Sequence, residues 1–209
     1  MDAFTVFYIL FIVISSIYRI LGLVNPKKIQ ISGMKGKVYA RYIFSVQLIL
    51  FIIIGVASIV EYFTLRKEKI NLIISLLGII MYIFATLGRL QSLKFLGKYW
   101  STDIKIKQGH KLIKEGPYRY IRHPNIAFLL VEISGLCLIP NSYCSLLLVW
   151  LGYLPVNLWR IHLEEKVVIE EFGQEYLDYK KEVPALLPLP LIKLKSMKRE
   201  EKSKEHKTR

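Results

Sequence analysis

Charged residues are almost absent from three long stretches of this 209-residue sequence. Residues 42–60 and 71–88 carry no charge, and residues 3–24 carry a single one, Arg19, near the end of the stretch. Each stretch has about the 20 residues that cross ~30 Å of hydrocarbon as a helix. Together with 53% hydrophobic residues and a mean hydropathy of +0.37, this pattern excludes an ordinary soluble domain and predicts three membrane-spanning helices.

The sequence also has few cysteines and no spacing of cysteine and histidine that is typical of a metal site. Its two cysteines, Cys137 and Cys144, lie on either side of a short turn among apolar neighbours. A disulfide between them is one alternative, but these surroundings favour a role in packing. We therefore predict that the protein holds no metal.

Two further apolar stretches, residues 125–139 and 143–159, are joined by a turn of Pro140, Asn141 and Ser142 that carries no charge. The first would cover only ~22 Å as a helix, which is a marginal span. We interpret the pair as a tightly closed helical hairpin packed within the bundle. The predicted fold is an all-α, integral membrane helical bundle with about five transmembrane helices, the last two forming a short helical hairpin.

The excess positive charge of +14 lies mainly in segments beside the membrane. Residues 94–122 and the chain after Arg160 are densely basic, whereas the turn of the hairpin carries no charge. Because basic loops stay on the cytoplasmic side, we expect the N-terminus outside and both basic segments in the cytoplasm. No basic domain with interleaved aromatic residues lies apart from the membrane, so the lipid bilayer is predicted as a partner and nucleic acid is not.

One membrane domain is predicted over residues 1–192. From Lys193 onward the chain is rich in lysine and glutamate and nearly free of apolar residues, which is typical of disorder. We therefore expect residues 193–209 to form a disordered basic tail in the cytoplasm, where it can contact anionic lipid headgroups.

Two polar clusters flank the predicted hairpin. The first is the basic segment GHKLIKEGPYRYIRHP, which ends at His123 and Pro124, and the second begins at Arg160 and ends at Glu165. Proline favours the first turn of a helix, so we expect Pro124 to begin a helix with His123 as its cap. The free N–H groups at such a helix start suit a carboxylate. Arg160 and Glu164 are four residues apart and share one helix face.

Each cluster alone has an ordinary structural interpretation, with His123 as an interfacial cap and Arg160 with Glu164 as a salt bridge on one helix. The predicted hairpin, however, brings both clusters together at the cytoplasmic end of the helical bundle. Polar groups at such a position are costly in a membrane protein and mark functional sites. We therefore favour a single site built from both clusters.

The polar segments of the C-terminal half also carry a specific resemblance. The matching residues are Leu96-Gly97-Lys98-Tyr99-Trp100-Ser101, His110-Lys111-Leu112-Ile113, Gly116-Pro117-Tyr118-Arg119-Tyr120-Ile121-Arg122-His123-Pro124, Arg160-Ile161-His162-Leu163-Glu164-Glu165, Phe172-Gly173-Gln174-Glu175-Tyr176, Tyr179, Val183-Pro184 and Pro188. In order and spacing this half of the chain resembles the isoprenylcysteine carboxyl methyltransferase family and its prokaryotic relatives, which share a core with phospholipid methyltransferases.

This resemblance implies a membrane methyltransferase whose cofactor, S-adenosylmethionine, binds within residues 94–192 in a pocket open to the cytoplasm. The implied cofactor-binding residues are His110, Lys111, Leu112, Ile113, Tyr118, His123, Pro124, Asn125, Ile126 and Glu164. Glu164 would pair with the ammonium group of the cofactor, and Arg160 would orient the methyl acceptor as the catalytic residue. The implied acceptor is a carboxylate on a lipophilic, prenylcysteine-like molecule that enters from the membrane.

The sequence departs from the family pattern after the Arg-His-Pro motif, where the family often has Tyr and Gly but this chain has Ile126 and Phe128. A phospholipid amine or another small lipophilic compound is therefore an alternative acceptor. Glu132, inside the short helix, is either a bundle-facing residue with a polar partner or a residue on the acceptor side. Sterol reductases share a similar core and use a nicotinamide cofactor, but their larger size and different closing motif make NADPH the less favoured alternative.

The predicted topology can be tested by labelling single introduced cysteines in intact membranes. Lys105→Cys and Lys204→Cys are expected to react from the same, cytoplasmic side, because both positions lie in densely basic segments. Glu68→Cys, between the second and third apolar stretches, is expected to react from the opposite side. Labelling of positions 105 and 204 from different sides would refute the topology.

Overall fold

The computed structural model describes residues 2–24, 35–66, 69–97 and 112–187. Its helices are α1 (Ala3–Val24), α2 (Lys35–Glu61), α3 (Leu72–Leu96), α4 (Pro124–Leu138), α5 (Tyr143–Leu148), α6 (Leu154–Phe172) and α7 (Gln174–Glu182). Short π- or 3₁₀-helical turns are η1 (Tyr62–Arg66), η3 (Gly116–Arg119) and η4 (Val149–Tyr153). Every regular element within the described ranges is helical, which confirms the predicted all-α class. The predicted tail at residues 193–209 lies outside these ranges.

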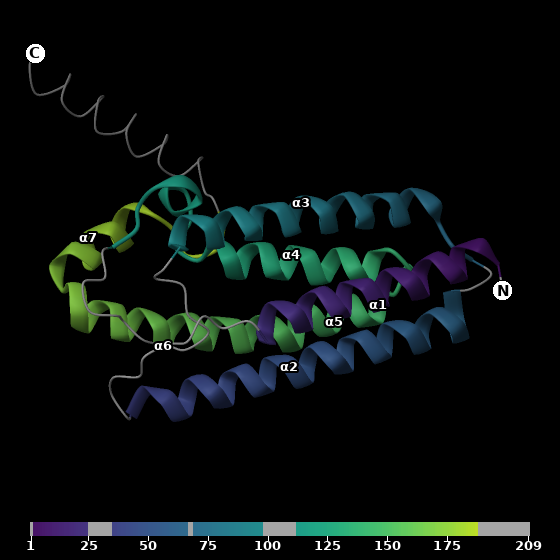
Figure 1. Cartoon of the computed structure of the whole chain (residues 1–209), viewed down its shortest axis with the longest axis horizontal. Helices are drawn as coiled ribbons and strands as arrows, with labels where there is room; N and C mark the ends of the chain where they lie inside the picture. Colours follow the sequence, from purple (N-terminus) through teal and green to yellow (C-terminus); the bar gives the residue numbers. More distant parts are fainter. Residues whose placement is uncertain (1, 25–34, 67–68, 98–111, 188–209) are drawn as a thin grey trace, which may run out of the picture.

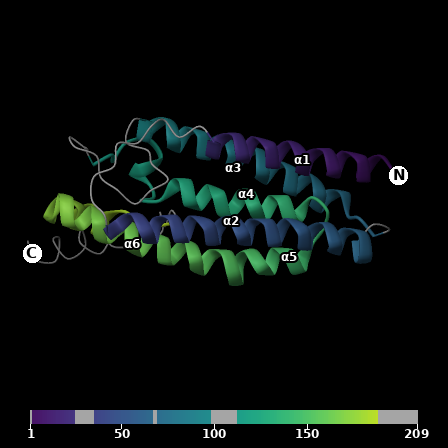
Figure 2. The same ribbon diagram turned by 60° about the horizontal axis from the view of Figure 1, so that its bottom comes forward.

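The axes of the helices α1 to α6 lie along the long axis of the molecule, and these helices form an elongated bundle (Figure 1, Figure 2). The N-terminus, the connection from α2 to α3 and the turn between α4 and α5 lie at one end of the bundle. The start of α4, the end of α6 and all of α7 lie at the other end. The structure thus groups at each end the segments that the charge pattern assigns to one side of a membrane.

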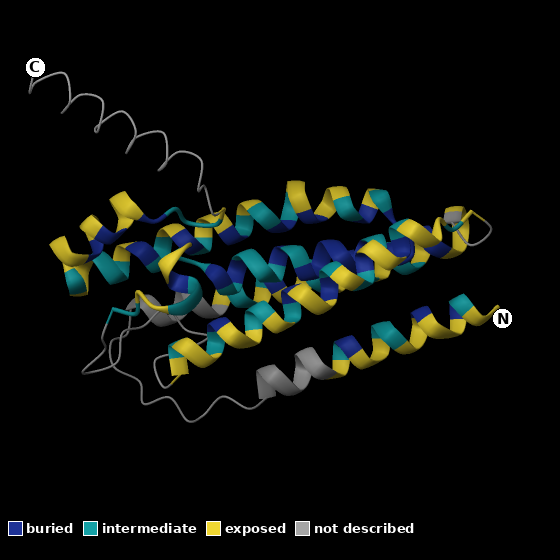
Figure 3. Ribbon diagram, turned by 90° about the horizontal axis from the view of Figure 1, so that it is seen from above, coloured by how far each residue is buried: buried dark blue, intermediate teal, exposed yellow. Residues whose placement is uncertain are grey.

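Exposed residues lie on the outside of the bundle, while buried residues gather between the helices (Figure 3). Many of the exposed residues are apolar, among them Leu10, Ile49 and Ile73. In the described ranges three helices are long and apolar enough to cross a membrane, namely Tyr42–Leu65, Leu72–Leu96 and Tyr143–Phe172, and two shorter apolar helices are Ala3–Ile17 and Pro124–Leu138. Such outer faces are stable in lipid, where helices satisfy their own backbone polar groups. The chain is therefore a multi-pass integral membrane protein.

The second helix of the hairpin continues past its apolar stretch. The elements α5, η4 and α6 join into one helix of 30 residues, Tyr143–Phe172, and Arg160 and Glu164 both lie on it, as the sequence predicts. The apolar stretch ends at Trp159, and the helix then continues through polar residues. The wide η4 turn precedes Pro155, whose ring nitrogen has no hydrogen to donate, and π turns accommodate prolines in membrane helices.

The helices α3 and α4 approach each other closely at two glycines. A Cβ atom on Gly78 would lie 2.9 Å from the carbonyl oxygen of Gly135, and a Cβ atom on Gly135 would lie 2.7 Å from the carbonyl oxygen of Gly78. Lipid tails are as apolar as leucine, so close backbone packing of small residues is a main cause of helix association in membranes. This contact fixes α4, and with it the Arg-His-Pro motif, against α3.

Hydrogen bonds close the hairpin at the end away from that motif. Asn141 adopts a left-handed conformation in the turn, with φ of 60°. Glu61 on α2 accepts hydrogen bonds from the backbone nitrogens of Cys144 at 3.1 Å and Ser145 at 3.0 Å, where α5 begins. Both cysteines are free. Cys137 is buried in the core, in agreement with the predicted packing role, whereas Cys144 is exposed and does not have that role.

Gly135→Ala is expected to lower the melting temperature of the detergent-solubilised protein, because the added methyl group forces α3 and α4 apart. Overpacking of this kind costs about 1–3 kcal/mol. Gly55→Ala on α2 is the matched control, since nothing lies within 4 Å of the Cβ position there. Equal melting temperatures for the two variants would contradict the close contact.

Candidate active site

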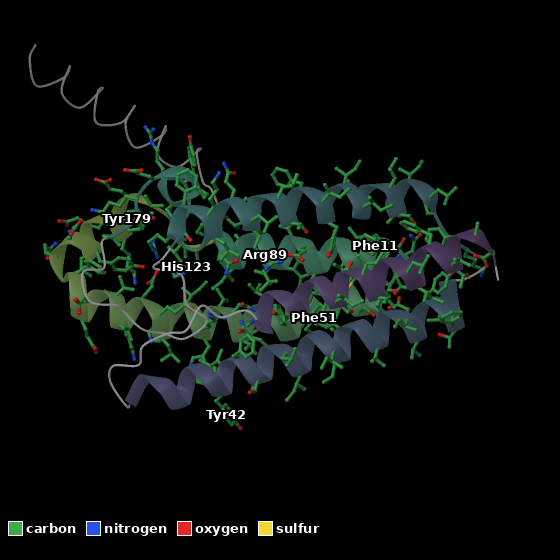
Figure 4. All side chains as sticks on the ribbon, in the orientation of Figure 1. Phe11, Tyr42, Phe51, Arg89, His123 and Tyr179 are labelled. Carbon is green, nitrogen blue, oxygen red and sulfur yellow. The ribbon has the colours of Figure 1, made fainter. Side chains whose placement is uncertain are left out.

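The start of α4 places His123 at the end of the bundle that carries α7 (Figure 4). The helix begins at Pro124 with His123 as its N-cap, as the sequence predicts. The imidazole does not cap the helix; its Nδ1 lies 3.5 Å from Oε2 of Glu164 and its Nε2 lies 3.3 Å from Oε1 of Glu165. The two polar clusters therefore meet through one imidazole and two carboxylates.

Glu165 lies at the centre of a group of basic side chains. Its Oε1 accepts hydrogen bonds from Nε of Arg122 at 2.9 Å and from Nη2 of Arg122 at 2.7 Å, and its Oε2 accepts one from Nζ of Lys180 at 2.6 Å. The Glu165 side chain is only 8% exposed. A carboxylate in such a place is costly unless charged donors compensate it. Glu165 therefore joins the start of α4 to α6 and α7.

The segment after α7 pairs with the backbone just before α4. The backbone nitrogen of Arg122 donates to the carbonyl oxygen of Pro184, and that of His123 donates to the carbonyl oxygen of Ala185, both at 2.9 Å. These bonds satisfy backbone groups that a helix start would otherwise leave exposed. They also fix the position of the Arg-His-Pro motif relative to α7.

Arg160 on α6 is held from two sides. Its Nε donates to Oε1 of Glu164 at 2.7 Å, and its Nη1 donates to Oε1 of Gln47 on α2 at 2.9 Å. In the described part of the chain, Nη2 of Arg160 has no hydrogen-bond partner. The salt bridge between Arg160 and Glu164, which the sequence leaves as one alternative, is therefore present. It belongs to a larger group of hydrogen bonds in which Nη2 of Arg160 has no partner among the described residues.

The two carboxylates on α6 favour the charged form of His123. Burial alone lowers the pKa of His123, but the hydrogen bonds to Glu164 and Glu165 and their negative charges raise it by more. The pKa of His123 is therefore raised above its usual value of about 6.5. The positive charge of a protonated imidazole beside Glu164 favours an anionic group of a ligand nearby.

Tyr118 and Leu112, both predicted to line the cofactor, hold the segment before α4 in place. The carbonyl oxygen of Tyr118 accepts a hydrogen bond from the hydroxyl of Tyr179, and the Tyr118 hydroxyl lies 3.5 Å from the backbone oxygen of Ser92. Leu112 packs against a buried cluster under α7 that includes Tyr176. This segment is thereby fastened to α3 on one side and to α7 on the other.

The remaining predicted residues differ in their surroundings. Pro124 and Ile126 are buried, and Ile126 belongs to the main hydrophobic core, whereas Ile113 is half-buried. His110 and Lys111 lie outside the described residues.

Asn125 has an unsatisfied polar atom. Its Oδ1 is buried and meets no hydrogen-bond donor among the residues that the structure describes. A buried acceptor left without a donor costs about 1–3 kcal/mol, so a ligand that donates a hydrogen bond there is favoured. S-adenosylmethionine has amino groups that can donate to Asn125, an ammonium that suits Glu164 and a carboxylate that suits His123. The residues present therefore fit this cofactor.

The structure accounts for two unusual residues of α4. The ring of Phe128 fills the space beside Gly88, where a Cβ atom would lie 2.5 Å from the ring, and it contacts the ring of Phe84 with centroids 5.9 Å apart. Glu132 is fully buried and accepts a hydrogen bond from Nε of Arg89 on α3 at 2.7 Å. The bulk of Phe128 is thus accommodated by α3, and the bundle-facing interpretation of Glu132 is supported.

Sequence reasoning gave no role to several residues of this site. Arg122 and Glu165 belong to the two polar clusters. Glu165 is adjacent to Glu164, and this pairing was a signal that both glutamates could take part in the site. Gln47 is a polar residue within a charge-free membrane helix, which is itself a mark of function. Lys180 offered no signal, because it is one of many basic residues near the C-terminus.

Residues 77–170 match the model of the Isoprenylcysteine carboxyl methyltransferase (ICMT) family. Over these residues the chain is similar to this family. The matched region begins within α3 and ends within α6, so it contains the Arg-His-Pro motif, Arg160 and both carboxylates.

Relatives of known name also match the chain. Over 148 residues the chain is 26% identical to the protein YpbQ of Bacillus subtilis (strain 168), which covers 70% of this chain and 84% of YpbQ. Over 121 residues it is 30% identical to Protein-S-isoprenylcysteine O-methyltransferase B of Arabidopsis thaliana, covering 55% of this chain and 59% of that protein. It is also 30% identical over 121 residues to Protein-S-isoprenylcysteine O-methyltransferase of Mus musculus, covering 55% and 41%. The chain thus spans about half the length of these two methyltransferases.

A solved structure shares the fold. The structure of the eukaryotic intramembrane Ras methyltransferase ICMT aligns with a TM-score of 0.57 and 23% identity, covering 66% of this chain and 52% of that one. This likeness shows a shared fold, a membrane helical bundle, and confirms the predicted fold class; the predicted number of five transmembrane helices stays a prediction.

The raised pKa of His123 predicts a pH dependence of stability. Protonated His123 stabilises the fold fully below its unfolded pKa of about 6.5, and this contribution is lost as the pH rises through the higher folded pKa. We expect the melting temperature to fall as the pH rises above about 6.5 and through the raised pKa of His123, and to fall less in His123→Gln. Parallel melting curves for the two proteins across this range would contradict the role given to His123.

Proposed function

We propose that this chain is an S-adenosylmethionine-dependent membrane methyltransferase that O-methylates a carboxylate on a lipophilic, prenylcysteine-like acceptor. The observation that carries the proposal is the junction of His123, Glu164 and Arg160 at one end of a bundle with a lipid-facing surface. This junction lies within the region that matches the family model, and relatives of the chain include protein-S-isoprenylcysteine O-methyltransferases.

The residues of the junction have separate tasks toward the cofactor. When bound, S-adenosylmethionine supplies an activated methyl group, which passes to the acceptor oxygen while the electrons of the C–S bond stay on sulfur. Glu164 pairs with the ammonium group, and the positive charge of protonated His123, at the start of α4, attracts the carboxylate. Asn125 accepts a hydrogen bond from an amino group through its buried Oδ1, which removes the cost of leaving that oxygen unpaired.

Arg160 has a task toward the acceptor. A carboxylate acceptor is already an anion, so the site needs no general base to remove a proton. The guanidinium of Arg160 is a planar donor that matches a carboxylate, and its Nη2 has no partner among the residues described. The work of the protein is therefore to align the two reactants and to exclude water.

Ligand-dependent thermal stability tests the proposal. S-adenosylhomocysteine is expected to raise the melting temperature of the detergent-solubilised protein, and NADPH is not. Glu164→Gln keeps the shape of the side chain but removes its charge, so the binding of S-adenosylhomocysteine should weaken by about 1.5–3 kcal/mol. Glu170→Gln changes an exposed carboxylate on the same helix and is the matched control. Wild-type affinity in Glu164→Gln would rule out its role.

The acceptor class is tested with radiolabelled S-adenosylmethionine and a total membrane lipid extract. Label that mild alkali releases as methanol indicates a methyl ester and supports the carboxylate acceptor. Label that resists alkali indicates an amine, as in a phospholipid headgroup, and would overturn the proposed acceptor while leaving the methyltransferase activity in place.

A further inference from the structure

Gln47 lies on α2, outside the family region at residues 77–170, and yet its side chain reaches the site. It is 5% exposed in a stretch of helix that carries no charge. Its Oε1 accepts a hydrogen bond from Nη1 of Arg160 at 2.9 Å, and its Nε2 donates one to Oδ1 of Asn157 at 2.8 Å. The amide of Gln47 is thus engaged at both its oxygen and its nitrogen.

These hydrogen bonds continue in series from Arg160 to the backbone of Tyr153, and each amide accepts one hydrogen bond through its oxygen and donates one through its nitrogen. Nδ2 of the fully buried Asn157 donates to the carbonyl oxygen of Tyr153 at 2.8 Å. A carbonyl oxygen can only accept and a guanidinium can only donate, so the two amides between them fit in a single orientation. The oxygen of Gln47 must therefore face Arg160.

Two contacts then fix the plane of the guanidinium. Gln47 holds Nη1 of Arg160 and Glu164 holds Nε at 2.7 Å, so rotation of the guanidinium breaks a charged hydrogen bond. Nη2 is left without a partner in the described ranges. A buried amide pair that served only to join α2 to α6 would need Gln47 and Asn157 alone, whereas here the pair ends on the charged group of the site.

We propose that Gln47 and Asn157 are positioning residues for methyl transfer, which hold Arg160 so that its Nη2 faces the acceptor oxygen. The inference rests on the proposed function, in which Arg160 binds the acceptor. It extends the site to a helix that the family region does not include. Recognition of the acceptor, and not of the cofactor, then depends on α2.

Gln47→Leu tests this role because it removes the amide with little change in volume. Wild-type and variant proteins in detergent are incubated with radiolabelled S-adenosylmethionine and a dilution series of total membrane lipid extract. The apparent kcat/KM for the acceptor is then measured from labelled lipid. We expect Gln47→Leu to lower kcat/KM by roughly tenfold, mainly through KM, while the affinity for S-adenosylhomocysteine stays within about twofold.

Two controls separate positioning from stability. Gln47→Leu combined with Asn157→Leu removes the amide that the single change leaves unpaired, so the melting temperature should recover while kcat/KM stays low. Ser58→Ala removes another buried hydrogen bond of α2, to the hydroxyl of Tyr8 at 3.0 Å, nearer the other end of that helix. It should lower the melting temperature and leave kcat/KM within about twofold of wild type.

The outcomes distinguish this inference from the proposed function. The inference is overturned if turnover recovers with stability in the double variant, or if Gln47→Leu keeps a wild-type kcat/KM. An equal loss of affinity for S-adenosylhomocysteine also overturns it, because the cofactor pocket would then be the part affected. A wild-type protein that neither binds S-adenosylhomocysteine nor labels lipid overturns the proposed function itself, and this inference with it.

Discussion

Two adjacent carboxylates on α6 hold the site together. Glu165 binds Arg122 at the start of α4, and Glu164 binds Arg160 on its own helix. His123 contacts both carboxylates and joins the two pairs. Buried carboxylates persist only where cations surround them. The end of α6 and the start of α4 are therefore locked to each other, and the chain after α7 is held on the same unit through backbone bonds.

The two glutamates are not equivalent. Both oxygens of Glu165 already accept hydrogen bonds at 2.6 to 2.9 Å, from Arg122 and Lys180. Among the described residues, the polar contact of Oε2 of Glu164 is with Nδ1 of His123, at 3.5 Å, which is long for a hydrogen bond. Glu164 can therefore accept a further hydrogen bond from a charged ligand, whereas the oxygens of Glu165 already accept hydrogen bonds that stabilise the fold. This difference explains why one of two neighbouring acids is the better candidate for the cofactor.

Packing far from these charges sets their geometry. The contact of Gly78 with Gly135 fixes how deep α4 lies beside α3, and the ring of Phe128 fits against Gly88 nearer the site. On the other side, Gln47 joins α2 to Arg160. In lipid the hydrophobic effect does not favour the association of helices, so close packing and hydrogen bonds between the helices must stabilise it. The arrangement of the site therefore depends on all the helices that contact α4 and α6.

The sequence by itself determined the helical membrane fold, because long runs without charge have few other stable states. It also determined the start of α4 at Pro124 and the meeting of the two polar clusters, since a proline restricts the backbone locally and a short turn closes a hairpin. The sequence also put Arg160 and Glu164 on one face of the second hairpin helix, past the apolar stretch that ends at Trp159, but hydropathy did not show that this helix ends at Phe172, because hydropathy reports the bilayer and not the helix. Only the tertiary structure decided that Gln47 meets Arg160, which is 113 residues away in the chain. Such pairs depend on how each helix is rotated and how deep it sits, and these are set by packing between helices rather than by any local pattern.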